Sequence, residues 1–211
     1  MNAVLSTVAA RVPSPRRPVL VAVDGADGAG KTEFADALGA ALTERGRLVV
    51  RGSIDDFHHP RAHRHELGRT AETVWARSFD HDALRRELLE PWRRGPGSAY
   101  RRRWHDLDTD EYVDEAATSV PERGVLLVDG VFAQRPELVD AWELVVWLEA
   151  PAAVRVARMA ARDGTVAEVA APDQQRYLGA QQIYYEACDP AGRAAVVIDN
   201  SDWEHPILLR G

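Results

Sequence analysis

Five short runs of apolar, mostly β-branched residues recur along the chain and are separated by stretches with helical periodicity. Runs that are apolar on both faces are typical of strands in a parallel sheet that helices cover on each side. We expect strands over residues 19–23, 47–50, 125–128, 143–148 and 194–198. We expect helices over 32–44, 70–77, 82–94, 151–162 and 172–188. This alternation predicts a three-layer α/β/α fold with a mainly parallel sheet.

Two segments do not follow this alternation. Residues 1–17, which end in a stretch rich in Pro, Ser and Arg, are expected to form a flexible lead-in to the first strand. Residues 95–123 lack a clear period, and we expect an insertion there that lies over one end of the sheet. Because no strong boundary divides the rest of the chain, residues 18–211 are predicted to form a single domain.

Composition and charge narrow the class of protein. The 211 residues are 45% hydrophobic and 28% charged, which is typical of a soluble globular chain. The apolar runs are too short to span a membrane, and the N-terminal charges follow the first apolar part, unlike those of a signal peptide. The single cysteine, Cys188, fits a reducing cytoplasm, and the net charge of −7 argues against an extended nucleic-acid surface. We therefore expect a cytoplasmic protein with no membrane or nucleic-acid partner; a homo-oligomer is left open.

A glycine-rich segment joins the first predicted strand to the first predicted helix. Residues 25–32 read GADGAGKT and match G-x-x-x-x-G-K-[ST] at every fixed position. Glycines let the backbone turn sharply and bring N–H groups against phosphate oxygens, and the helix that follows adds the positive end of its dipole. In such loops the lysine contacts the β- and γ-phosphates and the Ser or Thr hydroxyl ligates Mg²⁺. The residues predicted to bind a nucleoside triphosphate are Gly25, Ala26, Asp27, Gly28, Ala29, Gly30, Lys31 and Thr32.

Acidic residues follow the second and third predicted strands. Asp55 and Asp56 lie in RGSIDDFHHPR after the second strand, and Asp129 follows the third. In a parallel sheet these positions share one edge with the phosphate loop. A carboxylate there can accept a proton from an attacking hydroxyl or bind the metal. Each acid alone is as well explained as a helix cap or turn residue, but three beside a phosphate loop favour a catalytic or metal-binding role.

Several further motifs point to one family. In chain order they are GADGAGKT, DDFHHP, SFDHDAL, YRRRWH, VDGVF, RMAARD and RYLGAQQIYYEACDP, and they span roughly residues 19–200. With these motifs the chain resembles the uridine kinase family, within the wider group of uridine kinases, phosphoribulokinases and pantothenate kinases. The glycine loop is common to many nucleoside triphosphatases, whereas DDF together with FDHDAL at this separation is more diagnostic. The resemblance implies a phosphate-loop kinase fold with ATP and Mg²⁺ as cofactors.

The resemblance also implies catalytic and metal-binding roles. Asp55 resembles the general base that takes the proton from the acceptor hydroxyl. Arg158 and Arg162 resemble the arginines of a lid, over about residues 158–175, that closes on the transferring phosphoryl group together with Lys31. The residues expected to hold the metal are Thr32, Asp55 and Asp129.

A second set of residues is expected to contact the acceptor. Asp80 resembles the acid that holds the ribose hydroxyls, and Tyr100 and His105 resemble the residues that line the base pocket of uridine kinases. The full set of candidate substrate contacts is Asp55, Phe57, His58, Phe79, Asp80, Tyr100, His105 and Arg176.

Four positions depart from the family pattern. Asp129 replaces the usual Glu, His58 stands where Tyr is common, Met159 replaces a lid arginine, and Arg102 lies where the base pocket usually has an aromatic ring. The residues of phosphoryl transfer are present, but specificity for uridine or cytidine does not carry over.

The sequence therefore predicts an ATP-dependent kinase that phosphorylates a hydroxyl of a small molecule, most readily a nucleoside. A pantothenate-like or sugar-phosphate acceptor is an alternative within this class. A nucleotide-dependent switch is the alternative outside it, although the chain carries no N-K-x-D guanine signature.

Two charged clusters are predicted to be neither a zinc site nor a nucleic-acid site. The histidines of HHPRAHRH, residues 58–65, are interrupted by Pro60 and lack cysteine partners, which favours a solvated loop, with His58 toward the substrate, over a zinc site. The arginines at 93–94 and 101–103 are followed by an acidic run at 106–115, which favours a surface ion-pair patch over an anion or nucleic-acid site.

Overall fold

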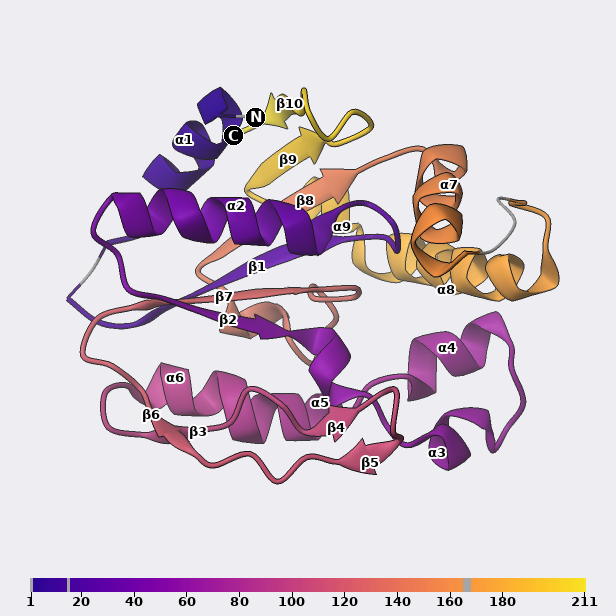
Figure 1. Ribbon diagram of the computed structural model, residues 1–211, viewed down its shortest axis with the longest axis horizontal. Coiled ribbons are helices and arrows are strands. Elements are labelled where there is room, and N and C mark those ends of the chain that lie inside the picture. The colour runs from indigo at the N-terminus through magenta and orange to yellow at the C-terminus, as the bar shows by residue number, and fades with distance from the viewer. Residues whose placement is uncertain (1, 15, 165–167) are drawn as a thin grey trace.

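The computed structural model describes residues 2–14, 16–164 and 168–211, and a six-stranded sheet lies at its centre (Figure 1). The strand order is β10-β9-β8-β1-β7-β2. Five strands run parallel, and the edge strand β10 pairs antiparallel with β9. The bounds are β1 Val19–Gly25, β2 Val49–Ser53, β7 Val125–Gly130, β8 Leu144–Glu149, β9 Val196–Asp199 and β10 Ile207–Arg210. The predicted parallel sheet is confirmed, with β10 added at one edge.

Alternate residues of β1 pack on opposite faces of the sheet, since successive side chains of a strand point in opposite directions. Val19, Val21 and Val23 belong to one buried cluster, whereas Leu20 and Ala22 belong to the other. Both faces are therefore covered, which explains why β1 is apolar along its whole length.

Helices form the two outer layers. The face with Val21 is covered by α1 (Asn2–Arg11) and α2 (Lys31–Glu44). The other face packs against α4 (Ala71–Arg77), α5 (His81–Ala83), the π-helical segment η2 (Leu84–Leu89), α6 (Glu90–Arg94), α8 (Pro172–Cys188) and α9 (Pro190–Arg193). α7 (Ala152–Asp163) lies near the end of the sheet where β1 leads into α2 (Figure 1). The three-layer α/β/α prediction is confirmed.

The N-terminal segment differs from the flexible lead-in expected for residues 1–17. Residues 2–11 form α1, whose residues Leu5, Val8 and Ala9 are buried, and Arg45, which follows α2, donates to the Ser6 carbonyl at 3.0 Å. Their spacing places these apolar residues on one face of a helix, so burial of that face orders the segment. Residues 1 and 15 of this range lie outside the described residues.

The insertion at 95–123 forms two short antiparallel ladders. β3 (Ala99–Tyr100) pairs with β6 (Thr118–Ser119), and β4 (His105–Asp106) pairs with β5 (Glu111–Tyr112). β3 packs on α6, and β4 packs on the 3₁₀ turn η1 (Ile54–Phe57) that follows β2 (Figure 1). The insertion therefore approaches the phosphate-loop end of the sheet through its second ladder.

The predicted lid, residues 158–175, lies partly in α7 and partly in α8, and its residues 165–167 lie outside the described residues. α3 (Arg61–His65) is a short helix after η1 and packs on α4. Within the described part of the chain, no helix has the length and apolar character that a bilayer span needs.

Candidate active site

The phosphate loop leaves β1 and enters α2 through two glycines in the left-handed region. Gly28 has φ 76° and Gly30 has φ 88°. A Cβ atom on Gly28 would lie 2.4 Å from the carbonyl oxygen of Arg155, so both the backbone angle and the space require glycine there. The loop is therefore held against α7, with the N-terminus of α2 directed at the space where phosphate would lie.

Lys31 and Thr32 begin α2, and each already has a partner. Lys31 Nζ donates to the Ala26 carbonyl at 2.9 Å, across the loop. The Thr32 hydroxyl donates to Asp129 Oδ2 at 2.7 Å, and Arg51 Nη2 donates to Asp129 Oδ1 at 2.8 Å. The side chain of Asp129 is 4% exposed, so these two bonds compensate a buried carboxylate.

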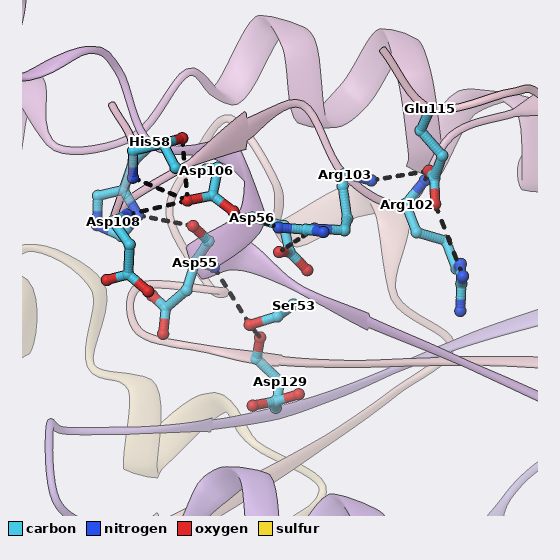
Figure 2. A network of polar contacts seen from close by, with 11 residues as sticks. Ser53, Asp55, Asp56, His58, Arg102, Arg103, Asp106, Asp108, Glu115 and Asp129 are labelled. Atoms are coloured by element: carbon cyan, nitrogen blue, oxygen red, sulfur yellow. Dashed lines mark hydrogen bonds and ion pairs between the residues drawn. The ribbon is translucent and has the colours of Figure 1, made fainter. Parts of the chain in front are cut away.

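Asp55 lies on η1, and the end of β2 fixes its position. Ser53 Oγ accepts from the Asp55 backbone N–H at 3.2 Å and donates to the Asp129 carbonyl at 3.3 Å (Figure 2). His58 Nδ1 lies 2.7 Å from the Asp55 carbonyl. The Asp55 side chain faces a cavity and is open to it, yet the surrounding protein desolvates the carboxylate and raises its pKa, an effect that His58 and Lys31 oppose.

The neighbouring Asp56 points away from this cavity. Arg103 donates to Asp56 at 3.3 Å and to Asp106 at 2.8 Å, which ties η1 to the insertion (Figure 2). Desolvation raises the pKa of Asp56 to about 6, although Arg103 lowers it. Of the two carboxylates in DDF, Asp55 is thus the one available to a ligand.

Arg102 and Arg103 each pair with acidic side chains, which confirms the predicted surface ion-pair patch.

A cavity of about 600 Å³ joins the loop to Asp55. Its polar floor comes from the phosphate loop and the first turn of α2, and α7 and α8 form the opposite wall. Leu107 from the insertion and Trp203 from the segment after β9 lie at its margins and are exposed. The lining residues are Asp27, Gly28, Gly30, Lys31, Thr32, Glu33, Phe34, Asp55, His58, Leu107, Arg158, Met159, Arg162, Asp163, Gln174, Tyr177, Asn200 and Trp203.

The two lid arginines have different surroundings. Arg158 donates to the carbonyls of Asn200 at 2.8 Å and Ser201 at 3.0 Å, and thereby connects α7 to the segment after β9. The Arg162 side chain is 72% exposed and pairs with Asp163 at 2.7 Å. Both arginines line the cavity, with Arg158 fixed and Arg162 at the solvent.

Several predicted substrate contacts lie outside the cavity lining. Tyr100 is buried against Trp92, with ring centroids 5.6 Å apart, and His105 is buried against Tyr112 at 5.7 Å. Both rings serve the packing of the insertion, and the structure does not bring them to the phosphate loop. Phe57 and Phe79 are also core residues.

Asp80 and Arg176 lie outside that lining as well. Asp80 Oδ1 accepts from the Ala83 backbone N–H at 2.8 Å and caps α5, while its other oxygen lies 4.0 Å from His59 Nδ1. Arg176 donates to the Tyr177 hydroxyl at 3.0 Å. Of the predicted acceptor residues, Asp55 and His58 are the two that line the cavity.

Some residues of the site had no sequence signal. Arg51 lies in β2, one residue beyond the strand predicted at 47–50, and Asn200, which donates to the Ala29 carbonyl at 2.7 Å, follows the last parallel strand, β9. Gln181 donates to Asp27 from the middle of α8. The histidines at 58–65 form no metal-binding group in the described part of the chain; His59 and His63 stack at 4.1 Å.

Comparisons with known proteins concern the fold of the chain. The Zeta toxin family model matches residues 2–85, which include the phosphate loop and Asp55. No curated protein matches the chain. A possible uridine kinase from Bacillus stearothermophilus superposes with a TM-score of 0.69 at 23% identity, covering 92% of this chain and 95% of that one.

Two further solved structures are similar over most of the chain. Phosphoribulokinase from Rhodobacter spheroides has a TM-score of 0.58 at 13% identity, covering 88% of this chain and 71% of that one. D-glycerate 3-kinase from Cryptococcus neoformans has a TM-score of 0.54 at 12% identity, covering 98% and 96%. The protein therefore has the α/β phosphate-loop fold of these kinases, and the resemblance seen in the sequence is confirmed for the fold.

Proposed function

We propose that the protein is an ATP-dependent kinase that transfers the γ-phosphoryl group to a hydroxyl of a small molecule. The observation that carries this proposal is the shared cavity, in which Lys31 and Thr32 of the phosphate loop and the Asp55 carboxylate face the same space. A nucleotide switch needs the loop but not a carboxylate aimed at an acceptor. The kinase structures that share the fold support the same class of reaction.

The proposed transfer is a direct displacement. The acceptor oxygen forms a bond to the γ-phosphorus, the bond from that phosphorus to the bridging oxygen of ADP breaks, and the acceptor proton passes to the Asp55 carboxylate. Desolvation, which raises the pKa of Asp55, makes this carboxylate a better proton acceptor. Lys31, which donates to its own loop, would exchange that bond for the phosphates.

The donor set fits a magnesium ion. The Thr32 hydroxyl and the Asp129 carboxylate are hydrogen-bonded to each other, and Thr32 and Asp55 both line the cavity, so oxygen ligands of the kind that Mg²⁺ prefers lie beside the phosphate loop. Thr32, Asp129 and Asp55 would hold the ion. When bound, it would neutralise charge that develops on the phosphates.

Arg158 and Arg162 are proposed to close on the transferring group. Arg158 is already connected to the segment after β9, while Arg162 has the solvent access that a moving side chain needs. Closure of this wall would exclude water from the γ-phosphate and limit ATP hydrolysis.

The acceptor is proposed to be a nucleoside, with a pantothenate-like or sugar-phosphate compound as the alternative. Because Tyr100 and His105 are buried elsewhere, a base would contact His58, Leu107 and Tyr177 instead. We place the activity in the cytoplasm, because the single cysteine, Cys188, is free and buried, and a reducing compartment keeps such a thiol reduced.

Acceptor-dependent ADP release tests the proposal. A panel of nucleosides, sugar phosphates and pantothenate is added with Mg²⁺-ATP, and at least one compound is expected to stimulate release. Asp55→Asn should lower kcat by about 100-fold or more, the usual value of a general base, and leave the affinity for ATP measured without Mg²⁺ unchanged. Asp140→Asn, a remote surface carboxylate paired with Arg85, serves as the control. Turnover that no acceptor stimulates would favour the switch.

A further inference from the structure

A buried relay of side chains holds the carboxylate of Asp27, a residue of the phosphate loop. Arg155 Nη1 donates to Gln181 Oε1 at 2.6 Å, and Gln181 Nε2 donates to Asp27 Oδ2 at 3.1 Å. Arg155 is 6% exposed and Gln181 is 2% exposed. Arg155 also donates to the carbonyls of Asp27 at 3.2 Å and Ala150 at 3.0 Å. The relay joins α7 and α8 to one side chain of the loop.

This relay fixes the direction of a carboxylate that a ligand can reach. Burial of an arginine and a glutamine is costly unless their polar atoms are hydrogen-bonded, and here both are. Asp27 lines the 600 Å³ cavity. Its Oδ2 is occupied by Gln181, and its Oδ1 has no hydrogen-bond partner in the described part of the chain. Asp27 therefore offers one oriented oxygen to the cavity.

The charge of Asp27 does not suit the phosphates that the loop holds. A carboxylate repels a polyphosphate at short range, and in the cavity Asp55 already supplies a second negative charge. Asp27 and Asp55 line the same cavity, Asp27 from the phosphate loop and Asp55 from η1. An O–H donor brought by the acceptor would satisfy Asp27 without adding charge.

We infer that Asp27 accepts a hydrogen bond from a second hydroxyl of the acceptor while Asp55 takes the proton of the first, and that the acceptor is therefore a polyhydroxylated compound. This inference rests on the proposed kinase function. It assigns Asp27 to the acceptor rather than to the nucleotide, and it makes Gln181 and Arg155 positioning residues. Nucleosides, sugars and glycerate belong to this class, whereas a compound with a single hydroxyl does not.

Matched pairs of acceptors test the inference by calorimetric binding in the presence of Mg²⁺ and a non-hydrolysable ATP analogue. D-glycerate is compared with 3-hydroxypropionate, and uridine with 3′-deoxyuridine, so that each pair differs by one hydroxyl. The wild-type chain should bind the fuller member of at least one pair about tenfold more tightly, the value of one charge-assisted hydrogen bond. Asp27→Asn should remove most of that difference and leave the Kd of the ATP analogue unchanged.

Two variants make the result specific. Glu33→Gln removes a charge from the same cavity wall at an exposed position and should keep the discrimination. Gln181→Leu should weaken discrimination without changing ATP affinity, because it frees the Asp27 side chain to rotate. If Asp27→Asn is too unstable to measure, the comparison of acceptor pairs on the wild-type chain still decides the substrate class.

Three outcomes would overturn the inference. The first is that the wild-type chain binds both members of every pair with equal affinity, and the second is that it binds none of the four compounds. The third is that Asp27→Asn loses affinity for the ATP analogue or Mg²⁺ and keeps its discrimination between the members of each pair. The kinase proposal is judged separately, since ADP release stimulated by 3-hydroxypropionate as strongly as by D-glycerate would uphold a kinase and reject the polyhydroxylated class.

Discussion

The Thr32 hydroxyl donates to Asp129 Oδ2 at 2.7 Å, and this bond joins the first turn of α2 to the end of β7. Arg51 occupies the other carboxylate oxygen at 2.8 Å and is itself 26% exposed. A buried carboxylate is costly when it is unpaired. Arg51 is therefore the cation that balances Asp129 when no metal is bound.

Arg51→Met should destabilise the protein and make it respond to magnesium. Loss of one partner of a largely buried ion pair typically costs about 3 kcal/mol. Because a bound cation can replace the lost charge, Mg²⁺ should restore more of the unfolding free energy in this variant than in the wild-type chain. Urea unfolding with and without Mg²⁺ measures both effects. Arg93→Met, which removes an exposed pair with Asp140, is the control and should change stability little.

Equal stabilisation of wild type and Arg51→Met by Mg²⁺ would show that Asp129 does not take part in binding the ion. A variant as stable as the wild-type chain without Mg²⁺ would show that the Asp129 charge is compensated by other groups.

Gly28→Ala and Gly46→Ala separate backbone strain from close packing. Both glycines have φ 76°, but a Cβ on Gly28 would meet the Arg155 carbonyl at 2.4 Å, whereas a Cβ on Gly46 meets nothing within 4 Å. Gly46→Ala should cost about 1 kcal/mol, the strain of a positive φ, and leave nucleotide affinity unchanged. Gly28→Ala should cost more and weaken ATP binding at least tenfold, because the loop must move. Similar ATP affinities in the two variants would contradict the close approach of the loop to α7.

The parts of the fold that were predicted from sequence are those that local patterns specify. Within residues 19–32, the apolar run predicts a strand, and the fixed spacing of glycine, lysine and threonine predicts a phosphate loop. Both lie where predicted. The bond between Gln181 and Asp27 links residues 154 apart, and the bond between Arg51 and Asp129 links residues 78 apart. Neither shows any local pattern, because tertiary packing alone brings those side chains together.

Tyr100 and His105 illustrate a different limit. An aromatic ring in a family motif is compatible with a ligand pocket and with a core, and the sequence does not show which neighbour it meets. Here Trp92 and Tyr112 provide packing surfaces, and burial of both predicted pocket residues follows.

Tyr184→Phe should destabilise the protein by about 2 kcal/mol at neutral pH. The Tyr184 hydroxyl donates to Asp24 Oδ2 at 2.5 Å and accepts from the Gln134 N–H at 2.9 Å, and Asp24 is fully buried. Burial raises the pKa of Asp24, and the hydrogen bond from Tyr184 opposes that rise. The loss should therefore be smaller in acid, where Asp24 is protonated. Urea unfolding at two pH values, with the exposed Tyr112→Phe as the control, measures this; a loss independent of pH would contradict it.

His81 should make the fold sensitive to mild acid. Its Nε2 is buried without a hydrogen-bond partner among the described residues, and desolvation lowers its pKa from 6.5 to about 4. The value of about 4 includes the smaller effects of Arg135 and His59, which lower the pKa, and of Glu137 and Asp80, which raise it. Since the folded pKa lies below the unfolded one, neutral His81 contributes its stability above pH 6.5, and this is lost as pH falls toward 4.

Between pH 7 and pH 5 this single side chain should remove about 2 kcal/mol from the unfolding free energy, because protonation then favours the unfolded chain. His81→Asn cannot titrate in this range, so its unfolding free energy should fall by about 2 kcal/mol less than that of the wild-type chain over the same interval. His205→Asn provides the control, since the His205 side chain is 79% exposed and already pairs with Asp202. Urea unfolding of the three chains at pH 7, 6 and 5 isolates the effect from that of the carboxylates, which all three share. If the wild-type and His81→Asn curves run parallel in pH, His81 accepts its proton in the folded state, and its surroundings must open to water at low cost.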